Sequence, residues 1–513
     1  MNNRKLYLVA IFFLSLVLFY QYSSEQRLEA EESQVALAGE LQEARGLSAE
    51  GGYVYLENDL LFLKINRGSG AIEEARSKAH LVESVEGSLG VRIFGSDVLN
   101  GFKYYFKSGF LASKKTYDPV KYIDGGVVLV SKDGTTSKTI KFGERPYELL
   151  ITDSLLDGAE TTGRPYASLY RSNARALDMN FDFMSGGFIN RSSYEAYAMS
   201  TSQDAYEADR LKSVDGSVGV TSAGGWIGFT QKYFLAALLG SDDYIYAYKV
   251  GKGKNGLYTM GYTVEPGDFD TGLFSEHTHT LFLGPKVRKD LVERADNLEQ
   301  TIEMGWFWFI SQPMVWLLDK IYGFVGNWGW SVVIITLLLK VVLWPVTGAG
   351  FRSMANMKKI QPEMKEIQQR YANDRQKLGA EMMALYKKHK VNPAGGCLPL
   401  LAQMPFFIAF FFGLREMVEL RHASFFWLDD LSAPDPYFIL PVVFGLIMVL
   451  TQKLNPQAPN MDPTQAQVMK VMPVLLSVFF IVFPSSLALY SVVNSGISLL
   501  QQRYLYSKHG RGS

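Results

Sequence analysis

The chain has 513 residues, with 51 Lys/Arg, 51 Asp/Glu and a single cysteine. This length exceeds that of one ordinary domain, and one cysteine excludes a disulfide-stabilised scaffold, so Cys397 is interpreted as a small core residue. The zero net charge hides a segregation, because residues 6–330 hold 31 Lys/Arg against 41 Asp/Glu, which leaves 20 against 10 elsewhere. The acidic and basic parts of the chain are therefore expected to lie in different surroundings.

The N-terminus joins Arg4-Lys5 to an apolar run, Leu6–Tyr22. At about 17 residues, this run is at the short end for a membrane span. It fits a signal peptide or an uncleaved anchor, and the absence of an A-x-A-like cleavage site after it favours the anchor. Residues 1–22 are therefore predicted to be a transmembrane anchor. The Glu-, Ala- and Gln-rich residues 23–50 are predicted to be a tether.

From Gly51 onward the pattern changes to short β-type segments separated by turn sequences. The predicted strands include Val54–Leu56, Leu61–Ile65, Phe102–Phe106, Gly126–Ser131, Ser137–Phe142 and Tyr147–Ile151. Such a series without intervening helices predicts an antiparallel β-sandwich domain over residues 51–300. A helix over Lys289–Glu303 is predicted to connect this domain to the membrane half.

His277 and His279 are the one metal-like feature of the predicted sandwich. On a strand, residues two apart face the same side, so a pair of imidazole ligands is conceivable. No third ligand is placed nearby, and we therefore predict no metal and no cofactor. No G-x-S-x-G, H-E-x-x-H or phosphate-loop pattern is present, so no catalytic residue is assigned and the chain is predicted not to be an enzyme.

The C-terminal part is dominated by long apolar runs. They lie at Tyr322–Val346, Cys397–Leu414, Pro436–Gln452, Val471–Phe483 and Ser485–Gln501. Residues 345–396 hold ten Lys/Arg and four Asp/Glu, and the tail 504–513 is basic, whereas residues 421–436 hold one Arg and three Asp. By the positive-inside rule, six spans with both termini in the cytoplasm fit every bias, and residues 23–320 are then exported.

The segment before the second span reads GWFWFISQP at Gly305–Pro313. Large aromatic residues before a proline, with no room for a full span, predict an interfacial helix over residues 301–320. Residues 321–503 are then predicted to form a five-span core that includes a cytoplasmic helical hairpin at 350–392.

Lys340 lies inside the apolar run LLLKVVLW. A charge there costs about 2.5–3.5 kcal/mol on insertion scales, so it is expected to face a polar cavity. The alternative is snorkelling, because Pro345 follows only five residues later. Side chains tilt toward a helix's N-terminus, here away from the nearer cytoplasmic surface, which favours the cavity. The other candidate lining residues are Thr336, Gln403, Tyr490, Ser491 and Asn494, each of which can instead make a helix–helix hydrogen bond.

In the predicted hairpin, apolar residues recur at helical spacing on either side of Asn373-Asp374, and Pro362 is expected to kink or restart the first arm. The candidate client-facing residues are Met354, Met357, Met364 and Met382, because unbranched thioether side chains adapt to varied apolar partners. They can equally pack the hairpin against itself. The basic side chains suit anionic headgroups, a ribosome or a targeting factor, or a simple solvated loop.

Several long motifs resemble one family. They are GNWGW at Gly326–Trp330, NPAGGCLPLLAQMPFF at Asn392–Phe407, FPSSLALY at Phe483–Tyr490 and GGWIGFTQKYF at Gly224–Phe234. With the run SVVIITLLLKVVLWP, they look like the YidC branch of the membrane insertases, which also includes the Oxa and Albino proteins of organelles. The likeness covers nearly the whole chain.

The resemblance implies a chaperone and insertase of the Gram-negative inner membrane, with residues 23–320 in the periplasm. It implies a five-helix core with a hydrophilic groove open to the cytoplasm and to lipid. Implied partners are nascent membrane proteins, the Sec translocon and the bilayer, with a ribosome or targeting factor at the hairpin and tail, and no sequence-specific nucleic acid. The family commonly has Arg at the position of Lys340, so a strict need for guanidinium geometry is doubtful here.

Two other functions remain open from the residues alone. A secondary transporter also uses intramembrane charges and proline-broken helices, although it would predict internal repeats that the spans lack. A membrane-anchored cell-envelope enzyme would place its active site in the β-domain.

Overall fold

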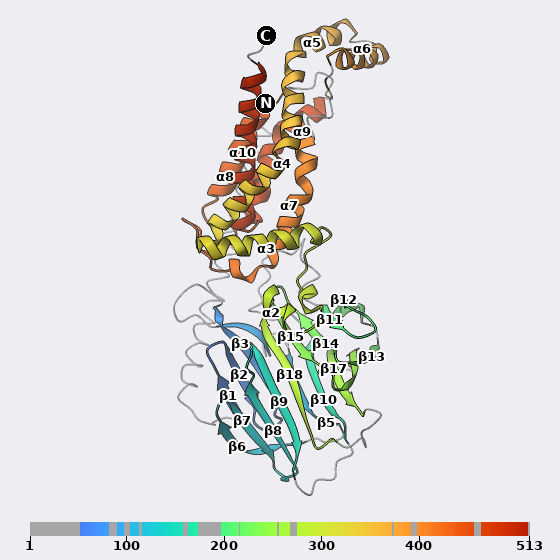
Figure 1. The fold of residues 1–513 in the computed structure, drawn as a ribbon, viewed down its shortest axis with the longest axis vertical. Coiled ribbons are helices and arrows are strands. Elements are labelled where there is room, and N and C mark those ends of the chain that lie inside the picture. The colour runs from blue at the N-terminus through green and yellow to red at the C-terminus, as the bar shows by residue number, and fades with distance from the viewer. Residues whose placement is uncertain are drawn as a thin grey trace. The chain divides into compact units, whose positions relative to one another are not determined.

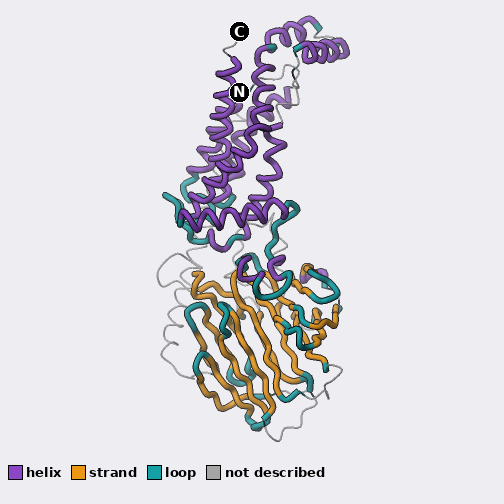
Figure 2. Tube along the Cα trace, viewed as in Figure 1, coloured by secondary structure: helices purple, strands orange, loops and turns teal. Residues whose placement is uncertain are grey.

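The computed structural model describes residues 52–81, 90–96, 103–111, 115–156, 163–172, 196–214, 216–253, 256–266, 274–371, 374–389, 391, 398–455 and 463–510. The chain forms two compact units, one built of strands and one of helices (Figures 1 and 2). The second unit runs from Pro285 to the C-terminus and takes in Gln231–Tyr233. The predicted anchor at 1–22, the tether at 23–50 and Cys397 lie outside the described residues.

The first unit is a sandwich of two antiparallel sheets. The first sheet has the order β1-β2-β3-β5-β10-β17-β16-β13, with β4 paired to β3. Its strands are β1 (Tyr53–Glu57), β2 (Leu61–Asn66), β3 (Ile72–Leu81), β4 (Gly90–Gly95), β5 (Tyr104–Phe110), β10 (Pro165–Ser172), β13 (Ser217–Ala223), β16 (Ile245–Lys252) and β17 (Leu257–Glu265).

The second sheet has the order β12-β11-β14-β15-β18-β9-β8-β7-β6. Its strands are β6 (Tyr117–Ile123), β7 (Gly126–Ser131), β8 (Thr136–Phe142), β9 (Glu148–Leu155), β11 (Ala196–Ser200), β12 (Glu207–Arg210), β14 (Trp226–Thr230), β15 (Phe234–Leu239) and β18 (Glu276–Pro285). A short 3-10 helix, η3 (Leu211–Ser213), follows β12.

Alternating burial explains why these segments form strands. In β10, the residues Pro165, Ala167, Leu169 and Arg171 face the interior, and the residues between them face outward. This period of two is the pattern of a sheet with one buried face. The all-β sandwich predicted from the sequence is therefore confirmed. The described parts of the predicted strands all lie within observed strands or within one residue of one.

The predicted helix over Lys289–Glu303 is wrong as a single element. The segment contains a five-residue helix, α2 (Arg288–Val292), and a 3-10 turn, η4 (Leu298–Thr301). Asn297 between them adopts a left-handed conformation with φ 62°, which no continuing α-helix allows. Asn is one of the few non-glycine residues that adopt this conformation readily. The break in the helix therefore depends on the conformation of one residue, which the amino-acid composition of the segment does not reveal.

The second unit is helical. Its helices are α3 (Trp308–Val325), α4 (Trp328–Lys359), α5 (Gln361–Arg370), α6 (Arg375–Lys388), α7 (Leu398–Glu416), α8 (Ile439–Leu454), α9 (Pro463–Phe479) and α10 (Ser485–Gly510), with 3-10 turns η6 (Val418–Leu420) and η7 (Phe480–Val482). One apolar cluster links α3, α4, α7, α8 and α10, with Leu318, Val332, Phe410 and Tyr490 among its buried members, whereas α5 and α6 pack on each other in a separate cluster.

A sharp corner separates α3 from α4. Gly326 closes α3 in the left-handed conformation with φ 68°, and Asn327 caps α4 by accepting a hydrogen bond from the backbone N–H of Trp330 at 3.1 Å. The apolar run that begins at Tyr322 is therefore divided between two helices. The GNWGW motif is the corner itself.

One described helix, Trp328–Lys359, is long and apolar enough to cross a membrane by length and composition. Ile439–Leu454 and Val471–Val482 are shorter apolar segments. Four of the helices contain an interior proline, at Pro313, Pro345, Pro405 and Pro473, and the 3-10 turn η7 directly follows α9 within the predicted apolar run Val471–Phe483.

Candidate functional site

The candidate site centres on Lys340, in the middle of α4. Its side chain is only 3% exposed, although its neighbours Val341 and Val342 on the same helix are largely exposed. Thr336, one turn earlier, and Thr347, two turns later, share its helix face and are also buried. The sequence therefore places a narrow polar stripe on the packed face of an otherwise apolar helix.

Two other helices supply the hydrogen-bond partners of Lys340. Its ammonium group donates to the side-chain Oε1 of Gln403 on α7 at 3.2 Å and to the Oγ of Ser498 on α10 at 2.6 Å. Polar partners offset part of the cost of removing an ammonium group from water. Lys340, which was predicted to face a polar cavity, is thus buried and held by polar groups of two other helices.

Gln403 lies between two polar groups. Besides accepting from Lys340, its side chain lies close to that of Tyr490 on α10. The ring of Tyr490 packs on Phe410, with 4.6 Å between ring centroids. Gln403 and Tyr490, both predicted as site residues, are thus brought to one place with Lys340.

Two of the other predicted lining residues make side-chain hydrogen bonds within their own helices. The Thr336 hydroxyl donates to the carbonyl of Val332 at 2.6 Å, and the Ser491 hydroxyl donates to the carbonyl of Leu487 at 2.8 Å. Asn494 is half-buried and uses its backbone carbonyl to accept from Ser498.

Sequence reasoning missed Ser498 and Gln501, which continue the polar face of α10 toward its C-terminal end. Gln501 meets Thr347 of α4 at 3.1 Å. The spacing of four residues from Asn494 to Ser498 was the available signal, because residues at that spacing share a helix face.

In the hairpin, the structure favours internal packing for two of the four predicted methionines. Met364 of α5 is 1% exposed and Met382 of α6 is 4% exposed, and both belong to one cluster with Leu385. Met357 packs at the margin of that cluster, whereas Met354 is buried against Phe351 and Leu505. Met383, which the sequence reading did not select, is 54% exposed.

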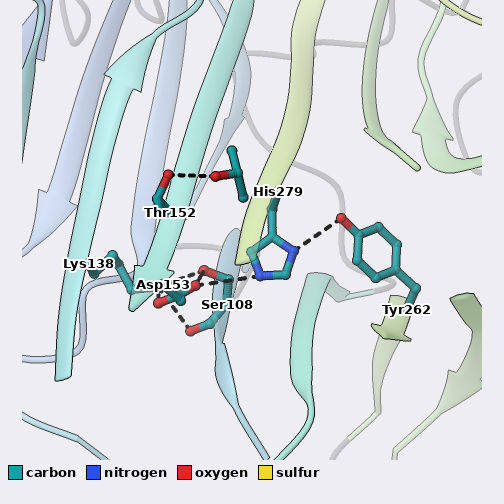
Figure 3. A network of polar contacts seen from close by, with 7 residues as sticks. Ser108, Lys138, Thr152, Asp153, Tyr262 and His279 are labelled. Carbon is teal, nitrogen blue, oxygen red and sulfur yellow. Dashed lines mark hydrogen bonds and ion pairs between the residues drawn. The ribbon is translucent and has the colours of Figure 1, made fainter. Parts of the chain in front are cut away.

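The two histidines of β18 share one face of the strand, as their spacing predicted, and both are buried inside the sandwich. Figure 3 shows the surroundings of His279. His279 accepts or donates a hydrogen bond with the Tyr262 hydroxyl at 3.1 Å, and its Nε2 lies 3.6 Å from Asp153. Asp153 in turn accepts from Lys138 and from Ser108, each at 2.6 Å. This cluster joins the two sheets from within.

The cluster is not arranged as a metal or catalytic centre. Burial lowers the pKa of His277 to about 4 and holds the pKa of His279 well below 6.5, so both imidazoles are neutral near pH 7. All six side chains, including those of Lys138 and Asp153, are buried, which leaves no access for a substrate. Across the described ranges, no group of three His, Cys, Asp or Glu side chains is placed to hold a metal ion.

Comparison with known proteins supports the motif resemblance. Residues 54–317 match the family model described as the YidC periplasmic domain, and residues 320–511 match the model of the 60Kd inner membrane protein. A crystal structure of an active YidC insertase, with its first transmembrane domain resolved, is similar over 88% of this chain and 92% of its own, at 18% identity and a TM-score of 0.42.

Two curated relatives carry the name membrane protein insertase YidC. The protein of Haemophilus influenzae (strain PittEE) is 33% identical over 546 residues, covering 98% of this chain and 97% of the relative. That of Hahella chejuensis (strain KCTC 2396) is 39% identical over 398 residues, covering 74% and 67%. Because one family model spans more than half of the chain and a relative matches over nearly its full length, the chain belongs to the YidC family of membrane protein insertases.

Proposed function

We propose that this protein is a membrane protein insertase and chaperone, which inserts nascent inner-membrane proteins alone or with the Sec translocon. Family membership supports the general activity. The observation that carries the mechanism is Lys340, a cation that is buried within the described helix long and apolar enough to cross a membrane and is held by Gln403 and Ser498.

The proposed topology has six spans: residues 1–22 and the helices α4, α7, α8, α9 and α10. Residues 23–320 are periplasmic, both termini are cytoplasmic, and the five helices form the core within 321–503. Helix α8 has 16 residues, about 24 Å at 1.5 Å per residue, against a hydrocarbon core of about 30 Å. Short spans of this kind thin the surrounding bilayer, which lowers the barrier to moving a polar flank across it.

Helix α3 fits the proposed place at the periplasmic interface. Met314 and Leu318 face the apolar cluster of the second unit, whereas Trp308 and Trp316 are exposed. Exposed tryptophans are enriched at the level of the lipid headgroups.

In the proposed mechanism, a client segment with a short polar or acidic flank enters a hydrophilic groove from the cytoplasm. Thr336, Gln403, Tyr490, Ser491 and Asn494 line the groove with Lys340. The groove hydrates the flank, and the Lys340 ammonium attracts its negative charge, which lowers the desolvation barrier. The apolar part then moves sideways into lipid, driven by burial of apolar surface and, for acidic flanks, by the membrane potential. No nucleotide or covalent step is required.

We further propose that the hairpin at 350–392 and the tail at 504–513 receive a ribosome or targeting factor. Their excess of basic residues suits an anionic partner or the anionic inner leaflet. Exposed Met383 is better placed to meet an apolar client than buried Met364 or Met382.

Disulfide cross-linking tests the groove. In a Cys397→Ala background, a single cysteine replaces Thr336 or Gln403, and the matched control replaces Val342, which is 69% exposed on the same helix. Ribosome-stalled clients with a cysteine beside the polar flank should cross-link at the first two positions and not at the third. Absence of any cross-link, together with small-solute flux that depends on the protein, would favour the transporter instead.

The charge is tested separately by substitutions of Lys340. Arg should retain insertion of a client with an acidic flank, Ala should reduce it, and Glu should reduce it further, because repulsion replaces attraction. A Glu variant that inserts acidic clients as well as the unaltered protein would eliminate electrostatic attraction from the mechanism.

A further inference from the structure

The outer face of the first sheet carries a hollow of about 1320 Å³ that the insertion mechanism does not use. Five adjacent strands, β5, β10, β17, β16 and β13, supply the residues that line it. All of these strands belong to the first unit, so the hollow is formed within the sandwich domain alone.

The strand register explains why the face is hollow. One row across the sheet pairs Lys107 with Ser168, Ser168 with Gly261, Gly261 with Lys249, and Lys249 with Gly219. Three of these five positions carry Ser or Gly, whose side chains are small or absent. The surface of the sheet is therefore recessed between Lys107 and Lys249 and on the far side of Lys249. Gly261 has no room for a side chain, since a Cβ there would lie 2.0 Å from the carbonyl oxygen of Ala167.

Aromatic rings rise beside this low row. Tyr166 and Tyr170 flank Ser168 on the same face of β10, and both line the hollow. The ring of Tyr170 is stacked on that of Tyr105 from β5, with 4.9 Å between centroids and 11° between planes. Stacked tyrosines give a rigid wall that offers apolar area together with hydroxyl groups.

The charge of the hollow differs from that of its domain. Among the described residues that line it, Lys107, Lys249 and Lys252 are the charged ones, and none is a carboxylate. Residues 51–300 as a whole hold 28 Lys/Arg and 32 Asp/Glu. Glu265, at the end of β17, is paired with Arg164, the residue just before β10, and is thereby neutralised.

We propose that this hollow binds extended acidic polypeptide segments, namely the exported flanks of client proteins. Lys107 and Lys249 lie three strand spacings apart, about 14 Å, which is the length of four residues of extended chain. Exported segments of membrane proteins are poor in Lys and Arg, so a carboxylate-free, lysine-bearing site discriminates them from cytoplasmic loops. This inference rests on the proposed insertase function and names a further client-binding site.

Binding is measured by fluorescence anisotropy with the full-length protein in nanodiscs. The probe is a labelled peptide with two aspartates four residues apart and a tyrosine midway; the comparison peptide has lysines in place of the aspartates. We expect only the acidic peptide to bind, with an affinity that falls as salt is raised from 0.05 to 0.5 M, because exposed charges are screened. An acidic oligosaccharide, oligogalacturonate, is the competing ligand class.

Matched variants locate the site. The double variant Lys107→Glu with Lys249→Glu should weaken binding of the acidic peptide by about tenfold, since two attractive charges become repulsive. Ser168→Trp places a large side chain between the two tyrosines of β10. It should abolish binding although it changes no charge. Lys141→Glu, on exposed β8 of the other sheet, is the control and should leave binding unchanged.

Three results would overturn the proposal: equal binding of the lysine peptide, binding of oligogalacturonate in preference to the acidic peptide, or equal weakening by Lys141→Glu. Reconstituted insertion of a client with a very short exported tail is measured on the same variants. If the hollow binds no peptide while this insertion persists, the client-binding inference fails and the insertase function stands. If insertion of this client is lost in the Lys340 variants but not in the variants of the hollow, the loss is assigned to the groove.

Discussion

At the scale of single residues, Lys340 joins a folding cost to the function proposed for it. An ammonium group inside an apolar helix is unfavourable by about 2.5–3.5 kcal/mol on insertion scales, so it persists only where its surroundings accept it. Here two side chains from two other helices do so, at 2.6 and 3.2 Å. The same partners that stabilise the charge in the resting protein also keep it directed inward, where a client's carboxylate would compete for it.

Two serines of α10 allow the hydrogen bond to Lys340 to be compared with an ordinary hydrogen bond within the helix. Ser491 and Ser498 each donate to the carbonyl four residues earlier, at 2.8 and 2.9 Å, but only Ser498 also accepts from Lys340. We expect Ser498→Ala to destabilise the helical unit by about 1.5–3 kcal/mol, the range for hydrogen bonds to charged groups. Ser491→Ala should cost less than about 1 kcal/mol.

The measurement is thermal unfolding of each variant in nanodiscs, with insertion of an acidic-flank client followed in parallel. If both serine variants lose the same stability, the hydrogen bond to Lys340 contributes nothing beyond the helix's own bond.

The buried imidazoles make the sandwich sensitive to acid. Above pH 6.5, His277 is neutral in both folded and unfolded chains and contributes nothing. Below pH 6.5, His277 takes up a proton in the unfolded chain, whereas in the folded chain it does so only near pH 4. The free energy of unfolding therefore decreases as the pH is lowered from 6.5 toward 4. From pH 7 to pH 5, His277 alone should account for a loss of about 2 kcal/mol.

Hydrogen exchange of β18 in the full-length protein, at pH 7 and pH 5 after correction for intrinsic rates, measures this loss. His277→Gln, which cannot take up a proton, should show a shallower pH dependence. Protection that is the same at both pH values in the unaltered protein would contradict the assignment. Asp153, Lys138, Tyr246 and Tyr262, which face the two imidazoles, are themselves buried, whereas Tyr244, whose ring lies edge-on to His277 with 4.8 Å between centroids, is exposed.

At the scale of elements, the hairpin distinguishes packing from exposure among similar side chains. Met364→Ala should loosen the contact of α5 with α6 by about 2–4 kcal/mol, because it empties a buried site. Met383→Ala, on the exposed face of α6, should change stability by less than about 0.5 kcal/mol. Hydrogen exchange of Gln361–Lys388 reports both effects.

If client cross-linking instead depends on Met364 and not on Met383, the hairpin must open to bind. A client that cross-links at residue 383 in the unaltered hairpin supports binding to its surface as it stands.

Elements with a strong local pattern could be predicted from the sequence, and those fixed by distant contacts could not. Lys340 was predictable because a charge within an apolar run is visible in one segment. Ser498 was not, because its partner lies 158 residues earlier in the chain. The apolar spacing on either side of Asn373-Asp374 matches α5 and α6, and Asp374 caps α6 by accepting from the backbone N–H of Lys377. Met354 and Met357 of the predicted first arm instead lie in the last turns of α4, and spacing alone does not tell which methionine is buried.

The same distinction between local pattern and distant contacts applies to strand pairing and to the ends of helices. Alternating residues predicted the strands of the sandwich, but the order in which they pair depends on contacts such as β18 with β9, more than 120 residues apart. The corner at Gly326-Asn327 is written in the GNWGW motif, whereas the left-handed Asn297 that ends the predicted connecting helix is specified by a single residue.

At the scale of the whole molecule, the boundary of a deletion decides what the deletion tests. Lys286, just after β18, belongs to the helical unit and forms a buried ion pair with Glu416 at the end of α7, at 3.2 Å. Its ammonium group also donates to the carbonyl of Thr301. A deletion that removes residues 55–290 therefore removes a partner of a buried carboxylate, whereas one that removes 55–284 keeps it.

We expect the protein lacking residues 55–284 to insert short-tailed clients and to melt somewhat below the intact helical unit, because the deletion also removes Gln231–Tyr233, and the carbonyl of Tyr233 accepts a hydrogen bond from the backbone N–H of Lys286. The protein lacking 55–290 should be less stable by up to about 3 kcal/mol, because Glu416 stays buried and retains only Arg415 as an ion partner. Lys286→Met in the full-length chain removes the charge alone and should reproduce most of that loss. Retained insertion in the shorter deletion would eliminate an envelope enzyme located in the sandwich. If both deletions melt at the same temperature, the Lys286–Glu416 pair does not stabilise the helical unit, and any loss of activity in either must come from the sandwich itself.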